Sequence, residues 1–177
     1  MQASSNIGSL RAASFLRTLC VFACAMVAMS GAGCDHGLDP IRDVSVQPGL
    51  SGRVTVRSAF PPPDSLKDLR IVLFRNYPPI GILEEFLAGA LRFSDPLPMD
   101  AASFEWQIRA DDLNGVYPYV VVAWQFGPDP FSNWRVAGVY APSGDPTRPQ
   151  AVDLGGGRFL QGIDIAVDFV NLPPQPF

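Results

Sequence analysis

Groups that could act as an acid, a base, a nucleophile or a metal ligand are few and unevenly placed in this chain. The single histidine is His36, and the three cysteines are Cys20, Cys24 and Cys34. The sequence after His36 therefore has neither an imidazole nor a thiol. Nucleophilic catalysis by a triad needs a base held beside the nucleophile by a third group, and zinc sites in proteins rely on several Cys or His ligands. The sequence predicts no catalytic residue, no metal site and no cofactor.

Carboxylates are the only abundant titratable groups. Asp111, Asp112 and Asn114 form one oxygen-rich turn, and Asp164 and Asp168 share the outer face of a predicted strand. Calcium takes roughly six to eight oxygen ligands, and the D-x-D-x-D-G spacing of a calcium loop is missing. We interpret these residues as turn-forming and solvated. A paired-carboxylate glycosidase site stays open at this point, because such pairs form in space rather than in sequence.

Aromatic side chains gather around one tight turn. Phe126, Phe131 and Trp134 bracket the turn 127–130, and Tyr140 lies further along the same predicted hairpin. Exposed rings at a loop tip stack on sugars or anchor protein interfaces. The alternative is that these rings fill the ends of the sandwich core, which is the usual place for tryptophan at strand positions. We take these four residues as the candidate binding residues.

The N-terminal residues have the pattern of an export signal. Arg11 and Arg17 form a basic flank, residues 19–29 are an apolar run, and residues 31–33 are small. The run is too short to cross a bilayer, which takes about 20 mostly apolar residues. A basic flank, a short apolar run and a small-residue cleavage site together indicate a secretory signal.

Cys34, directly after those small residues, resembles the lipobox cysteine of bacterial lipoproteins. The chain departs from the usual pattern at Gly31, where lipoboxes commonly carry leucine. The resemblance implies that residues 1–33 are removed as a signal peptide, that the thiol of Cys34 carries the lipid, and that residues 34–43 form a tether. It places the protein in the cell envelope as a membrane-anchored lipoprotein. Asp35 follows this cysteine; in enteric lipoproteins an aspartate at this position implies the inner membrane, but the rule does not hold in all phyla, so the choice between inner and outer membrane stays open.

Size and charge limit the number of domains and the classes of partner that the chain can have. Removing residues 1–33 leaves 144 residues, enough for one domain with its own core, expected over residues 44–172 with a loose tail at 173–177. Of the 13 basic residues, Arg11 and Arg17 belong to the leader, so 11 basic and 17 acidic residues remain, a net charge of −6. This balance, with no basic run, argues against nucleic acid and against electrostatic attraction to anionic lipid.

Apolar residues alternate along most of the domain, which predicts strands. The expected strands are 51–59, 69–74, 104–109, 116–126, 134–140, 150–154 and 161–170. In the last of these, Ile163, Ile165, Val167 and Phe169 should face inward. Between residues 81 and 92 the apolar period becomes helical, because Ile82, Leu83, Phe86, Leu87, Ala90 and Leu91 recur at helical spacing, and it predicts one short helix.

About seven short strands separated by turns predict an all-β fold, a single antiparallel β-sandwich with one short helical insertion. Three segments resemble transthyretin-like (prealbumin-like) domains, the group that includes carboxypeptidase regulatory domains. They are the opening residues 52–54, the turn 114–117 and the closing residues 162–165. The resemblance covers roughly residues 50–170. It implies the sandwich fold and transfers no active site.

Taken together, these features predict a non-enzymatic, lipid-anchored envelope lipoprotein that serves as an interaction or structural module. The lipid anchor supplies the membrane contact. The expected partner is another envelope protein or a glycan, contacted through the hairpin 126–134. The alternative is a carbohydrate-binding or hydrolase-accessory module that uses the same aromatic hairpin.

Overall fold

The computed structural model describes residues 47–176. The predicted leader and tether lie outside the described residues, and so do Cys34 and His36. Within the described part, the chain forms ten strands, one short 3-10 turn, η1 (Pro63–Ser65), and one short helix, α2 (Ile82–Leu87). The all-β prediction is confirmed.

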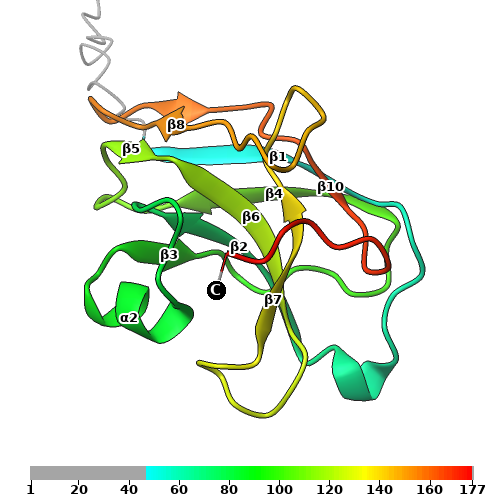
Figure 1. The fold of residues 1–177 in the computed structure, drawn as a ribbon. Helices are drawn as coiled ribbons and strands as arrows, with labels where there is room; N and C mark the ends of the chain where they lie inside the picture. Colours follow the sequence, from blue (N-terminus) through cyan, green and yellow to red (C-terminus); the bar gives the residue numbers. More distant parts are fainter. Residues whose placement is uncertain (1–46, 177) are drawn as a thin grey trace, which may run out of the picture. The chain divides into compact units, whose positions relative to one another are not determined.

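The strands form two four-stranded sheets and a two-stranded ribbon (Figure 1). The first sheet contains β1 (Gly49–Val56), β4 (Ser103–Arg109), β9 (Phe159–Leu160) and β10 (Ile165–Val167). The second has the order β3 (Leu91–Phe93), β2 (Asp68–Phe74), β6 (Tyr119–Gln125) and β7 (Trp134–Val139). The ribbon pairs β5 (Val116–Tyr117) with β8 (Val152–Asp153). The layout is that of a β-sandwich.

Apolar side chains from the two sheets form the main core. On β2, Leu69, Ile71 and Leu73 point into this core together with Trp124 of β6 and Val54 of β1. All of them are almost completely removed from water. Alternation of inward and outward side chains along each strand places these residues on one face of the sheet.

The second sheet is apolar on its other face as well. Val72 and Phe74 of β2, with Val121 and Val136 of the neighbouring strands, form a second buried cluster. Ile82 of α2 covers part of this cluster. A sheet with two apolar faces needs a cover on each of them, which is the structural reason for the helical insertion between β2 and β3.

β1 occupies the middle of the first sheet. It pairs antiparallel with β4 over its whole length, with Gly52 opposite Trp106. On its other side it pairs in parallel with β9 at its start and with β10 at its end, where Val54 lies opposite Ile165. The first strand of the domain, β1, and the last strand, β10, are thus direct neighbours.

The two sheets meet along the side formed by β7 and β10. The amide of Asp168 donates to the carbonyl oxygen of Ala137 at 3.0 Å. A Cβ added at Gly138 would meet the carbonyl oxygen of Ala166 at 2.4 Å, so this close approach requires glycine. The tail, which we expected to be loose, also lies here: the Gln175 side chain accepts from the amide of Val136 and donates to its carbonyl oxygen, both at 2.9 Å.

Several boundaries differ from those predicted. The expected strand 116–126 is divided at Pro118 into β5 and β6, because proline has no N–H to donate to a ladder. The strands β3 and β9 were not anticipated. The expected helix 81–92 ends at Leu87, and Leu91 and Arg92 instead belong to β3, where they pair with β2. Residues 163, 165, 167 and 169 are all buried, as predicted.

Candidate interaction surface

The loop at 126–134 is held rigid by Asp129. Its carboxylate accepts hydrogen bonds from the Ser132 hydroxyl at 2.6 Å and from the amide of Phe131 at 2.9 Å. These bonds stabilise the charged form and hold the pKa of Asp129 below its usual value. The loop is closed by the amide of Phe126, which donates to the carbonyl oxygen of Asn133 at 2.8 Å. Loop geometry of this kind fixes where the neighbouring rings point.

Trp134 and Phe131 lie on the same side of this loop but differ in exposure. Trp134 is only 7% exposed, its indole N–H donates to the carbonyl oxygen of Pro130 at 2.7 Å, and its ring packs against Phe93. Phe131 is 44% exposed. Of these two candidate residues, therefore, one is part of the core and one is available to a partner.

Phe126 and Tyr140 are directed elsewhere. Both are partly buried against the core between the sheets, and the guanidinium of Arg135 lies 4.7 Å from the centre of the Phe126 ring. Burial raises the pKa of the Tyr140 hydroxyl, and the nearby carboxylate of Asp164 adds to this effect. The four aromatic candidates thus do not form one platform.

Phe131 instead belongs to an apolar groove over the second sheet. Its ring faces that of Phe86 from α2, with 6.3 Å between the ring centres. The groove has a volume of about 230 Å³, and Ile82, Phe93 and Trp134 also line it. At its polar end the Asp68 carboxylate and the Arg70 guanidinium form an ion pair, so their charges compensate each other.

α2 turns several of its apolar residues outward. Of the six apolar residues that recur at helical spacing in this segment, Leu83, Phe86 and Leu87 are exposed, and Leu87 is 76% exposed. The buried residues of the helix are Ile82 and Glu85. The apolar period predicted a helix here, and the structure shows which side of it faces the sheet.

Glu85 explains this orientation. The side chain is only 2% exposed, and its carboxylate accepts hydrogen bonds from the Asn76 side-chain amide at 2.7 Å and from the amide of Ile80 at 3.3 Å. These bonds organise the loop 76–80 ahead of the helix. A buried carboxylate needs such partners. The helix is oriented so that Glu85 reaches them, and in this orientation Leu83 and Leu87 face the solvent. No period in the sequence distinguishes Glu85 from its exposed neighbour Glu84.

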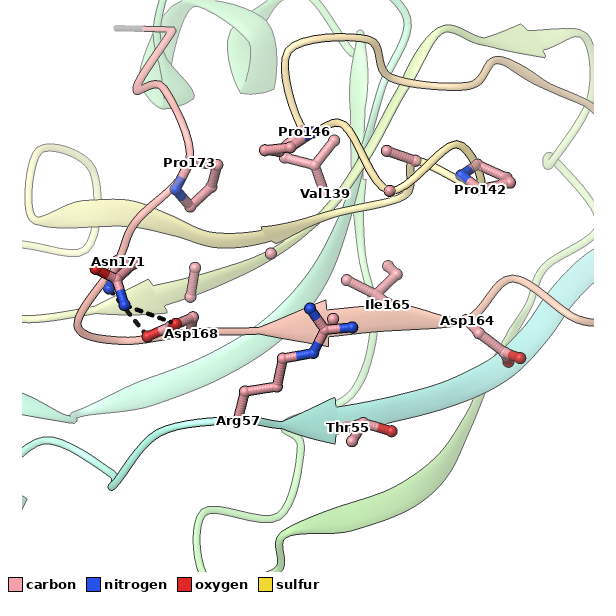
Figure 2. Close-up of a pocket in the computed structure, with 15 residues that line it drawn as sticks. Thr55, Arg57, Val139, Pro142, Pro146, Asp164, Ile165, Asp168, Asn171 and Pro173 are labelled. Atoms are coloured by element: carbon pink, nitrogen blue, oxygen red, sulfur yellow. Dashed lines mark hydrogen bonds between the residues drawn. The ribbon is translucent and has the colours of Figure 1, made fainter.

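A larger depression, of about 510 Å³, lies where β1, β7 and β10 meet. Figure 2 shows Arg57 beside β10, with Asp164 and Asp168 toward opposite ends of the strand. Both carboxylates are engaged within the domain: Asp164 accepts from the amide of Arg53 at 2.8 Å, and Asp168 accepts from the amide and side chain of Asn171 at 2.9 and 3.1 Å. The Asn171 bonds, together with the amide of Val170, lower the pKa of Asp168 to about 2.

The carboxylates of the turn 111–114 are also used structurally. Asp111 accepts from the side-chain amide of Gln47 at 3.1 Å, and Asp112 forms an ion pair with Arg92 at 2.6 Å. Among residues 47–176, no group of three or more His, Cys, Asp or Glu side chains is placed to hold a metal ion. In the same part of the chain, no helix is long and apolar enough to cross a membrane.

Comparisons of the chain with protein-family models, with curated proteins and with solved structures gave no match.

Proposed function

We propose that this protein is a non-enzymatic, lipid-anchored lipoprotein of the cell envelope, and that its sandwich domain is an interaction module. The observation that carries the proposal is the apolar surface made by Ile80, Leu83, Phe86, Leu87 and Phe131, which we call the α2 surface. All five side chains are exposed, and Ile80 and Leu87 are more than three-quarters exposed. Contiguous apolar patches of this kind mark contact sites on soluble domains.

Support for the anchor comes from the sequence. The basic flank, the short apolar run and the small residues before Cys34 have the order of a lipoprotein signal. Acylation at that cysteine would hold the domain at a membrane without any spanning helix, since stable anchoring needs more than one acyl chain and a lipoprotein cysteine carries several.

Support for a non-catalytic role comes from the use of the carboxylates. Asp111, Asp112, Asp164 and Asp168 all accept hydrogen bonds or ion pairs within the domain. A general acid or base must instead be free to reach a substrate proton. The resemblance of residues 52–54, 114–117 and 162–165 to transthyretin-like domains remains part of the proposal.

A glycan-binding role has less support. Sugar stacking needs exposed aromatic faces, and the Trp134 ring is buried against Phe93. Of the four candidate aromatics, only Phe131 is exposed, and it is 44% exposed. We therefore place the contact at the α2 surface rather than on an aromatic platform.

The test uses photo-cross-linking, which captures protein and lipid neighbours alike, in intact cells that express the full chain. The surface variant is Leu87→Ser/Phe131→Ser, and the matched control is Val170→Ser, which removes another exposed apolar side chain away from the α2 surface. We expect the surface variant to lose cross-linked products that the control retains. Equal products from both variants would contradict a contact at the α2 surface. Separately, Cys34→Ala should release the protein from the membrane fraction, and retention would contradict the lipid anchor.

A further inference from the structure

Resting on the proposed anchor, we propose that the α2 surface docks on the lipid bilayer to which the protein is attached, so that Leu83, Phe86, Leu87 and Ile80 enter the membrane interface. The partner of this surface is then lipid rather than a second protein.

The start of β1 and α2 lie toward the same end of the domain, although they belong to different layers. Gln47, the first described residue, donates to Asp111, whose neighbour Asp112 bonds to Arg92. The Arg92 guanidinium in turn donates to the carbonyl oxygen of Gly89, two residues beyond the end of α2, at 3.2 Å. These bonded and adjacent residues connect the entry of the chain to the end of the helix. In Figure 1, β1 begins at the upper left and α2 lies at the lower left.

The chain between Cys34 and Gln47 is short. Thirteen residues span at most about 45 Å even when fully extended. A bilayer that holds Cys34 therefore always lies within this distance of Gln47, where the chain enters the domain. Linking two contacts in this way makes the second one intramolecular, at an effective concentration in the millimolar range for a short linker. Weak apolar docking becomes well populated under these conditions.

The exposed side of α2 is suited to lipid. At about 100° per residue, Phe86, Leu83 and Leu87 share one continuous arc of the helix, and Glu84 lies about half a turn from Phe86. Leucine and phenylalanine on a protruding turn transfer favourably into an acyl environment. Glu85, the other carboxylate of the helix, is buried beneath and bonded to Asn76. No charge of the helix interrupts this arc.

The net charge indicates which force drives the docking. Without residues 1–33 the chain has 11 basic and 17 acidic residues, a net charge of −6, and anionic headgroups would repel it. Docking is thus apolar, so it should occur on uncharged phosphatidylcholine and change little with salt, unlike attraction by a basic patch, which salt screens.

The test reads insertion depth at one site. Mature, lipidated protein with Leu87→Cys is labelled with bimane at residue 87 and reconstituted into phosphatidylcholine vesicles, with and without doxyl-labelled lipid. The matched control is Ser65→Cys, an exposed position in η1, which Figure 1 shows far from α2. We expect doxyl lipid to quench the label at residue 87 but not at residue 65, at low and at high salt. In the Leu87→Cys background, Ile80→Ser should lower the docked-to-free ratio about tenfold, the usual effect of removing one buried large aliphatic side chain.

Two readouts separate this proposal from the anchor on which it rests. The mass of the purified protein reports acylation of Cys34 and therefore the anchor, whereas quenching at residue 87 reports docking. Acylation without quenching at residue 87 would leave the anchor standing and overturn docking. An unacylated Cys34 would overturn the anchor, whatever the quenching at residue 87. Protection of residue 87 in native membranes but not on pure lipid would also overturn lipid docking and point to a protein partner.

Discussion

Replacing Gly52 by alanine should be one of the most damaging single-methyl changes in this domain. The Cβ would lie 2.1 Å from the carbonyl oxygen of Ile163 and 2.4 Å from its carbonyl carbon. Both are backbone atoms, so no side chain can turn aside to make room. The segment cannot retreat freely either, because the amide of Ile163 donates to the carbonyl oxygen of Ser51 at 3.0 Å.

The expected loss combines two effects. Forcing extra volume into a packed region costs about 1–3 kcal/mol, and disrupting the bond between Ile163 and Ser51 costs about 1 kcal/mol. The free energy of unfolding should therefore fall by about 3 kcal/mol. For a domain of about 130 residues with an unfolding entropy of about 2.1 cal/mol/K per residue, this lowers Tm by about 11 °C.

Urea and thermal unfolding, followed by circular dichroism, measure this loss. Gly144→Ala is the matched control, because a Cβ at Gly144 meets no atom within 4 Å while its φ of 80° still strains an alanine. That strain costs roughly 1–2 kcal/mol. We expect Gly52→Ala to be clearly the less stable of the two variants. If Gly52→Ala is as stable as wild type, or more stable than Gly144→Ala, the reasoning from close backbone packing at β1 is refuted.

Three further predictions concern polar contacts. Asp168→Asn should reduce the loss of stability in acid. The pKa of Asp168 is about 2 in the folded protein and about 3.9 in the unfolded chain, so its contribution to stability is present above about pH 3.9 and is lost as the pH falls toward 2. Urea midpoints of wild type and variant at pH 7 and pH 3 test this, and a fall in midpoint between the two pH values that is as large in the variant as in wild type would contradict it. Glu85→Ala should lower the free energy of unfolding by about 1–2 kcal/mol because the Asn76 amide loses its acceptor, whereas Glu85→Gln, which keeps an oxygen there, should cost less in the same urea assay. Gln175→Ala should cost about 1 kcal/mol and speed hydrogen exchange at the amide of Val136; unchanged exchange would mean that the tail does not protect this edge.

The sheets could be predicted because their signal is local. Alternation along residues 163–169 correctly identified the inward side chains, and the same pattern located most of β1, β2, β4 and β7. β3 was missed because Leu91 and Phe93 also continue the helical period of the preceding segment. Pairing with β2 makes these residues a strand rather than the end of the helix. The sequence of one segment does not show which other segment it pairs with.

The surface was harder to predict, because it depends on contacts between segments. Phe131 and Trp134 are both aromatic and only three residues apart, but the carbonyl oxygen of Pro130 bonds the indole of Trp134 and fixes it over Phe93. Likewise, Glu84 and Glu85 have the same side chain, and only the position of Asn76 selects which one is buried. Such choices are made by three-dimensional neighbours rather than by residue type.

The parallel pairing of β1 with β10 has a mechanical consequence. The two strands point the same way, so a pull on the start of β1 against the chain that follows β10 slides one strand along the other. Sliding loads all the hydrogen bonds of the pair at once, whereas peeling would break them one at a time. β1 is also held by β4 along its opposite edge. A pull on the start of β1 is therefore resisted by the pairing along both of its edges.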